Sequence, residues 1–208
     1  MIKNVKWLGH STIKIVGNKV IYIDPYNIKT FFNDADIIFI THNHYDHFSK
    51  EDIKKCMHKN TKIIVTKDLY EEALDLGFEK DNIISILPNN SYTLEDISFS
   101  TLPAYNINKE FHPKESNWVG YVININNIKY YIAGDTDLTD ESRKVKCDIA
   151  FLPVGGIFTM NYEEASELAN EIKPKIVIPI HYGTLVGTKE DALKFKSNLK
   201  DCIKCEFL

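Results

Sequence analysis

The chain has 208 residues, of which 44% are hydrophobic and 12% aromatic, so it is long enough to bury a large core and too apolar to be disordered. Its net charge is −4, and no block or stripe of basic residues offers the surface that nucleic acids bind, so no nucleic-acid partner is expected. No segment approaches the roughly 18 consecutive apolar residues of a membrane helix, and the N-terminus lacks a signal-peptide core, so a cytoplasmic protein without a membrane partner is expected.

Short apolar strands dominate the first part of the chain and begin as an antiparallel meander, with a turn signal at Gly17-Asn18. Ser49 is suited to begin a helix, and Gly77 is suited to end the next one. The expected strands are 3–8, 11–16, 19–24, 62–66, 83–86, 97–102, 119–125 and 128–133, and the expected helices are 49–57 and 68–76.

The last part of the chain alternates regularly between strands and helices. Asn161 followed by Glu164 has the spacing that caps a helix N-terminus. The expected strands are 148–154, 175–180 and 202–207, and the expected helices are 162–172 and 189–199. Meanders followed by helices in each half predict two sheets packed face to face, with helices on their outer faces. No linker divides the chain, so residues 1–208 are expected to form a single domain.

The stretch 41-THNHYDHFSK-50 places three of the seven histidines and one aspartate within six residues, directly after the apolar run 36-DIIFI-40. His42 and His44 are two residues apart at the end of a strand and therefore point the same way, while Asp46 and His47 follow a turn. Imidazole and carboxylate groups at this density suit a divalent ion such as zinc. The alternative is a polar loop whose histidines face water.

Two more candidate ligands stand where apolar strands end. Asp135 lies in 131-YIAGDTD-137, and His181 lies in 176-IVIPIHYG-183. Ligands at the ends of strands on one rim of a sheet can meet. Their recurrence favours the metal-site interpretation over a solvated loop.

These residues resemble the metallo-β-lactamase superfamily. The segment 42-HNHYDH-47 is similar to its H-x-H-x-D-H motif, 134-GDTD-137 to its later metal-bridging aspartate, and 180-IH-181 to its terminal histidine. The resemblance implies the α/β fold of that superfamily, a four-layer αβ/βα sandwich with a two-metal centre at one edge. It implies that His42 and His44 hold the first metal, that Asp46, His47 and His181 hold the second, and that Asp135 bridges them.

The short stand-alone branch that includes the ascorbate-6-phosphate lactonases is the most similar, through 7-WLGHS-11, 22-YIDP-25 and 130-YYIAGDTD-137. That branch usually supplies its third histidine as P-A-x-H, whereas this chain reads 103-PAYN-106. Three interpretations follow: His112 is the ligand, Asn106 coordinates weakly through its carbonyl oxygen, or the first metal site is depleted. We favour His112.

Other residues are candidates for supporting roles. Asp24 ends a strand just before Pro25, where a carboxylate can fix the tautomer of a ligating imidazole. It is also explained as a simple turn residue. His10, Asn106 and Tyr182 are candidates for contacts with substrate, although each is also explained by packing or turn formation.

The predicted function is hydrolysis of a small-molecule lactone or other ester by a hydroxide that a dinuclear, zinc-type centre holds, with Asp46 and Asp135 as the catalytic carboxylates. Mn²⁺ or Fe²⁺ could replace Zn²⁺. Two alternatives stay open, a phosphodiesterase of the same fold and a non-catalytic metal-binding or sensing module. The sequence leaves homo-oligomerisation open.

Overall fold

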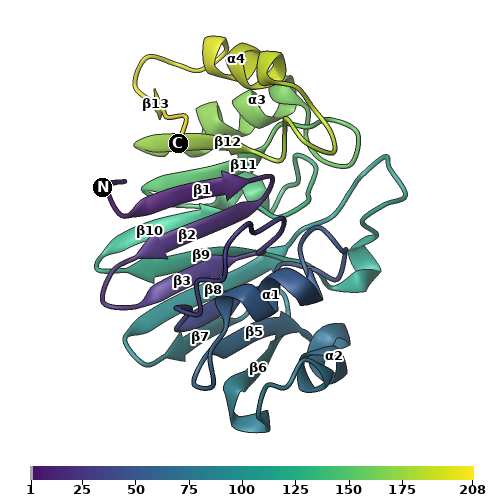
Figure 1. Cartoon of the computed structure of the whole chain (residues 1–208). Coiled ribbons are helices and arrows are strands. Elements are labelled where there is room, and N and C mark those ends of the chain that lie inside the picture. The colour runs from purple at the N-terminus through teal and green to yellow at the C-terminus, as the bar shows by residue number, and fades with distance from the viewer. Residues whose placement is uncertain (1) are drawn as a thin grey trace. The chain divides into compact units, whose positions relative to one another are not determined.

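The computed structural model describes residues 2–208 and divides into two compact units, one up to Leu87 and the other from Pro88 onward. Each unit contains one mixed sheet (Figure 1). The expectation that the whole chain is one domain stays a prediction.

The sheet of the first unit has the strand order β1-β2-β3-β4-β5-β6. Its first three strands form the predicted antiparallel meander, and β3 to β6 run parallel to one another. Both faces of β4 and almost all of β5 are buried, as is usual for parallel strands. The strands are β1 (Val5–Gly9), β2 (Thr12–Val16), β3 (Val20–Ile23), β4 (Ile37–Phe39), β5 (Lys62–Thr66) and β6 (Ile83–Ile86).

Two short helices, α1 (Lys50–Cys56) and α2 (Tyr70–Asp75), belong to the first unit. Ser49 caps α1 by accepting a hydrogen bond from the Asp52 backbone, as the sequence predicts. Ile53 of α1 and Ala73 of α2 are completely buried in an apolar cluster with side chains of β3, β4 and β5. Two 3-10 turns, η1 (Lys67–Leu69) and η2 (Lys80–Asn82), flank α2.

The sheet of the second unit has the order β13-β12-β11-β10-β9-β8-β7. Strands β7 to β10 are antiparallel neighbours, and β10 to β13 are parallel. The same change from meander to parallel strands therefore occurs in both units. The strands are β7 (Ser91–Leu94), β8 (Ile97–Pro103), β9 (Val119–Ile125), β10 (Ile128–Ile132), β11 (Ile149–Pro153), β12 (Ile176–Ile180) and β13 (Lys204–Cys205).

The helices of the second unit are α3 (Tyr162–Ile172) and α4 (Lys189–Ser197), and α3 packs against both β11 and α4. The predicted capping box of α3 is present, because Asn161 accepts from the backbone of Glu164 while Glu164 accepts from the backbone of Asn161. Two 3-10 turns, η3 (Lys114–Ser116) and η4 (Ser142–Lys144), lie in its loops.

Two elements differ from the sequence prediction. Strand β7 was not expected, because its sequence SYTL is half polar and it pairs only with β8. The last strand is two residues long instead of 202–207, because the chain turns at 201–202 and meets β12 only from Lys204. Within residues 2–208, no helix is long and apolar enough to cross a membrane.

Candidate metal centre

The parallel strands of the first unit carry polar residues directly after their carboxyl ends. Ile23 at the end of β3 is in register with Phe39 at the end of β4, so Asp24 and Thr41 lie beside each other. The Asp24 carboxylate accepts hydrogen bonds from the Thr41 backbone N–H (2.8 Å) and the Thr41 hydroxyl (2.7 Å). Both residues are buried, so these bonds are shielded from water.

Asp24 and Thr41 fix the orientation of two predicted ligands. Nδ1 of His47 lies 2.8 Å from the Asp24 carboxylate, which can only accept, so His47 carries its proton on Nδ1. Nδ1 of His42 lies 2.9 Å from the Thr41 hydroxyl oxygen. Because Thr41 gives its own proton to Asp24, His42 must donate from Nδ1. In both imidazoles Nε2 is then the nitrogen that can ligate a metal.

A tight turn brings the rest of this histidine segment together. The His44 carbonyl accepts hydrogen bonds from the backbone of His47 (3.0 Å) and of Phe48 (2.8 Å). The ring of His42 lies 4.7 Å from that of His44 and 4.0 Å from that of His47, measured between ring centroids. The predicted crowding of these ligands is therefore present within the first unit.

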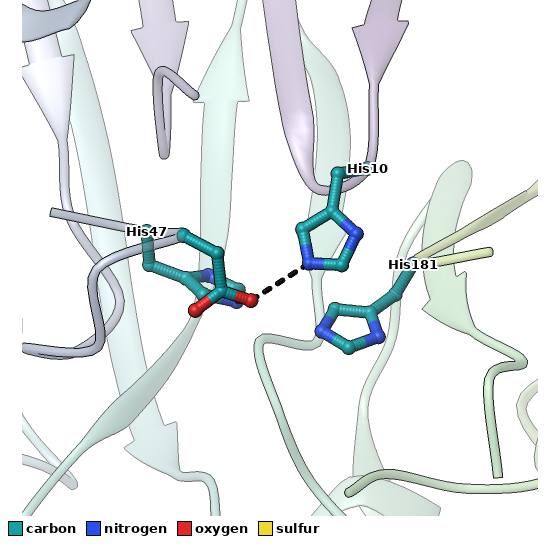
Figure 2. A group of neighbouring side chains, drawn as sticks. His10, His47 and His181 are labelled. Atoms are coloured by element: carbon teal, nitrogen blue, oxygen red, sulfur yellow. Dashed lines mark hydrogen bonds and ion pairs between the residues drawn. The ribbon is translucent and has the colours of Figure 1, made fainter. Parts of the chain in front are cut away.

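His10 lies in the turn between β1 and β2 and reaches the same segment. Its Nε2 donates a hydrogen bond to the Asp46 carboxylate at 2.8 Å, drawn as the dashed line in Figure 2, where His10 and His47 are labelled. His10, Asp46 and His47 each offer one possible ligand atom, and these three atoms lie within 4.8 Å of one another. His10 thus holds Asp46 in place, and its contact with substrate stays a prediction.

In the second unit, Asp135 follows β10 and His181 follows β12. The Oδ2 atom of Asp135 lies 3.0 Å from Nε2 of His181 and 3.4 Å from Nε2 of His112. Two ligands of one tetrahedral zinc ion, each bonded at about 2.0–2.1 Å, lie roughly 3.3 Å apart. The spacing of these three buried side chains therefore suits ligands that share metal ions through Asp135.

The loop between β8 and β9 holds the two residues that the sequence offered as alternatives. Nε2 of His112 is the atom that faces Asp135, while Nδ1 of His112 faces the side-chain oxygen of Asn106 at 2.9 Å. Asn106 therefore lies behind His112, on the side of the ring away from Asp135. Neither a direct role of Asn106 in coordination nor its contact with substrate is supported by this placement.

Backbone geometry is unusual at three of the predicted site residues. His10, Asp24 and His181 have φ values of +49°, +44° and +58°. These values lie in the left-handed region, which residues other than glycine seldom adopt. Such conformations cost of order 1–3 kcal/mol each and gather at functional sites. These conformations therefore support a functional role for each of the three residues.

Close packing also surrounds His181. A Cβ added to Gly155 would lie 2.6 Å from the His181 carbonyl oxygen and 3.2 Å from its Nδ1. The glycine is therefore needed for space beside His181. Tyr182 next to it is buried, and this burial raises the pKa of its phenol. The predicted contact of Tyr182 with substrate stays a prediction.

Two residues important to this geometry were missed in the sequence. Thr41 orients His42 and binds Asp24, and Asp137 binds Asn106. A signal was available for both, because Thr41 immediately precedes the histidine motif and Asp137 is the second aspartate of 134-GDTD-137.

The donor set fits a divalent metal of the zinc type. Its members are imidazoles and carboxylates, which are ligands that zinc, manganese and ferrous iron accept. The predicted ligands that the structure gathers in the first unit are His42, His44, Asp46 and His47, and those in the second are His112, Asp135 and His181.

Comparison with known proteins gives consistent similarities along the chain. A family model described as "Beta-lactamase superfamily domain" matches residues 4–181. The "UPF0173 metal-dependent hydrolase" of Thermococcus onnurineus is 32% identical over 97% of this chain and 93% of its own. The corresponding protein of Nanoarchaeum equitans is 34% identical over 95% and 92%.

Solved structures show the same similarity. A protein of Parabacteroides distasonis with a known crystal structure has 30% sequence identity to this chain. Its TM-score is 0.85, and the match covers 98% of this chain and 91% of the other. A metallo hydrolase from Ignicoccus hospitalis is 24% identical, with a TM-score of 0.81 over 98% and 94%.

Proposed function

Because the chain belongs to the β-lactamase superfamily, and within it to the UPF0173 metal-dependent hydrolases, we propose that it hydrolyses a small-molecule lactone or other ester with two divalent ions of the zinc type. Membership of the metallo-β-lactamase superfamily and the α/β fold of that superfamily, both predicted from the sequence, are confirmed. The observation that carries the proposal is the position of Asp135, because one of its carboxylate oxygens, Oδ2, faces both His112 and His181.

We propose the following ligand assignment. His42, His44 and His112 hold one ion, and Asp46, His47 and His181 hold the other, with Asp135 as the bridge. Support comes from the fixed tautomers of His42 and His47 and from the two contacts of Asp135. When bound, a zinc-type ion lowers the pKa of a water molecule towards ~7 and polarises a carbonyl oxygen.

The protein's own residues prepare this chemistry in three ways. Asp24 and Thr41 hold imidazoles with Nε2 available for ligation. His10 donates to Asp46 and so keeps one carboxylate oxygen in a defined position. The burial of Asp24, His47 and Asp135 keeps water from competing with these bonds.

The substrate class follows from what the chain lacks and from its size. A net charge of −4 and 208 residues leave no basic surface for a polyanion, so a small carbonyl substrate is favoured over nucleic acid. A phosphodiester is the second candidate, because a pair of metal ions also suits phosphoryl transfer.

The test is a hydrolysis assay of the zinc-loaded chain against a panel of lactones and simple esters, with bis-p-nitrophenyl phosphate in parallel. We expect turnover of at least one lactone or ester, which falls to the background rate in His42→Ala because a ligand is lost. His58→Ala is the control and should keep activity, because His58 is a half-buried histidine that lies just after α1 and outside the ligand set. Turnover of the phosphodiester alone would contradict the ester proposal.

A further inference from the structure

Asn106 and His112 lie in the loop between β8 and β9, and the contacts of Asn106 define its role. It is 7% exposed and lies three residues after β8. Its side-chain oxygen faces both the backbone N–H of His112 (3.1 Å) and Nδ1 of His112 (2.9 Å). The Asn106 backbone in turn donates to the His112 carbonyl (2.8 Å), so three contacts tie the two residues together.

The orientation of the Asn106 amide is determined by its other neighbours. Its nitrogen donates to the Asp137 carboxylate (3.0 Å) and to the Phe158 carbonyl (2.9 Å), and both of these groups can only accept. A flipped amide would place its oxygen against two acceptors and its N–H₂ against the His112 N–H. The amide oxygen must therefore face His112, and His112 must carry its proton on Nδ1.

A partly buried ion pair between Lys109 and Asp137 anchors this arrangement. Asp137 is 4% exposed and also accepts from the Ile107 backbone N–H at 2.9 Å. The Lys109 ammonium forms a close ion pair with the same Asp137 oxygen that Asn106 uses, and it donates to the Thr159 carbonyl at 2.9 Å. Asp137 is thus held from both sides and cannot turn away from Asn106 without breaking several bonds.

We propose that Asn106, anchored by Asp137 and Lys109, is the positioning residue that sets His112 in the Nδ1–H tautomer and directs its Nε2 towards Asp135, an inference that rests on the metal-binding function proposed above. Asn106 itself does not ligate, because its oxygen is used by two His112 donors. In this loop His112 is thus the ligand, and Asn106 is the group that orients it.

The first test uses the metal-free chain, so it does not depend on hydrolysis. Long-range ¹H–¹⁵N NMR correlations of the histidine rings distinguish the two neutral tautomers, and the signals missing in His112→Ala assign His112. We expect the Nδ1–H form in the native chain and a shift towards the Nε2–H form in Asn106→Ala. An Nε2–H tautomer of His112 in the native chain, or no change in Asn106→Ala, would overturn the proposal.

The second test measures zinc affinity by competition with a chromophoric chelator. Asn106→Ala should lower the affinity for one of the two zinc ions by about 10–100-fold, as is typical for the loss of a group that orients a ligand. Lys109→Met removes the anchor but leaves Asn106 in place, so it should lower the affinity for the same ion by a smaller factor. This variant keeps the test informative if Asn106→Ala does not fold.

Asn170→Ala is the matched control. Asn170 also donates to a backbone carbonyl and accepts from a backbone N–H, those of Asn198 and Lys200, but it lies on α3. It should change neither the tautomer nor the affinity. A native chain that binds no metal would contradict the proposed function, while the NMR experiment would still decide whether Asn106 sets the tautomer of His112.

Discussion

His181 shows how single residues shape this site. It adopts a left-handed backbone conformation directly after the buried strand β12, and its imidazole lies 3.0 Å from Asp135. Gly155, in the loop after β11, leaves the space that His181 occupies. The strain at His181 is therefore maintained by packing around it, and this packing can be tested.

Gly155→Ala should disturb His181 directly. The added methyl group would lie 2.6 Å from the His181 carbonyl oxygen and 2.8 Å from Cγ2 of Val186, distances that force a shift of backbone. We expect a loss of about 1–3 kcal/mol in the free energy of unfolding, measured in urea, and weaker zinc binding.

Gly77→Ala is the control for this variant. Gly77 has a positive φ of +98° but has no atom within 4 Å of an added Cβ, so its substitution adds backbone strain without a clash. It should lower stability while zinc affinity stays unchanged. Equal zinc affinity in native and Gly155→Ala proteins would show that Gly155 is not required for the position of His181.

The sequence identified most of the individual candidates but not how they support one another. The ligand candidates stand out because histidines and aspartates are dense at the ends of apolar strands. Thr41 and Asp137 adjoin these motifs, but threonine and aspartate are also ordinary turn residues, and the contacts by which they orient His42 and Asn106 are visible only in the fold. The same holds for Gly155, whose importance depends on a residue 26 positions later.

At the scale of elements, Asp52 of α1 connects its helix to the loop after β3. Its buried carboxylate accepts from the backbone N–H groups of Asn27 (2.8 Å) and Ile28 (3.0 Å) and from Ser49 and Lys55. Burial alone would raise the pKa of Asp52, but these hydrogen bonds together hold it below its ordinary value.

This lowered pKa predicts a pH-dependent contribution to stability. An unfolded aspartate has a pKa of about 3.9, so ionised Asp52 stabilises the fold fully above that pH, and the stabilisation is lost as the pH falls through the lower folded pKa. Asp52→Asn should therefore reduce the free energy of unfolding at pH 7 by about 1–3 kcal/mol, and the difference from the native chain should shrink as the pH falls below about 3.9.

Urea unfolding at pH 7, 5 and 3 measures this effect. Glu51→Gln is the control, because the neighbouring Glu51 side chain is 81% exposed where it pairs with Lys55, so its substitution should change stability little at any of these pH values. A deficit in Asp52→Asn that is as large at pH 3 as at pH 7 would contradict the assignment.

Sequence patterns predicted the strongly apolar elements well and the short polar ones poorly. Strands β3, β5 and β12 stand out because parallel strands are apolar on both faces. Strand β7 has the burial of an edge strand and a polar sequence that is also typical of a loop. Its pairing with β8 is a tertiary contact that no local pattern records.

For the whole molecule, the change from meander to parallel strands in each unit places proposed ligands and the residues that orient them at strand ends. Asp24 and His42 follow neighbouring parallel strands of one sheet, and Asp135 and His181 follow parallel strands of the other. The superfamily was recognisable from the order and spacing of these residues along the chain. Substrate choice was not, because it depends on loop side chains whose sequence carries no general signature.

We propose a two-metal centre in which His112 is a ligand and Asn106 is not. Metal content measured by mass spectrometry on protein purified without chelator tests this directly, for the native chain, His112→Ala and Asn106→Ala. We expect about two ions per native chain, about one in His112→Ala, and about two in Asn106→Ala when zinc is supplied in excess. One ion or fewer in the native chain, unchanged in His112→Ala, would contradict it.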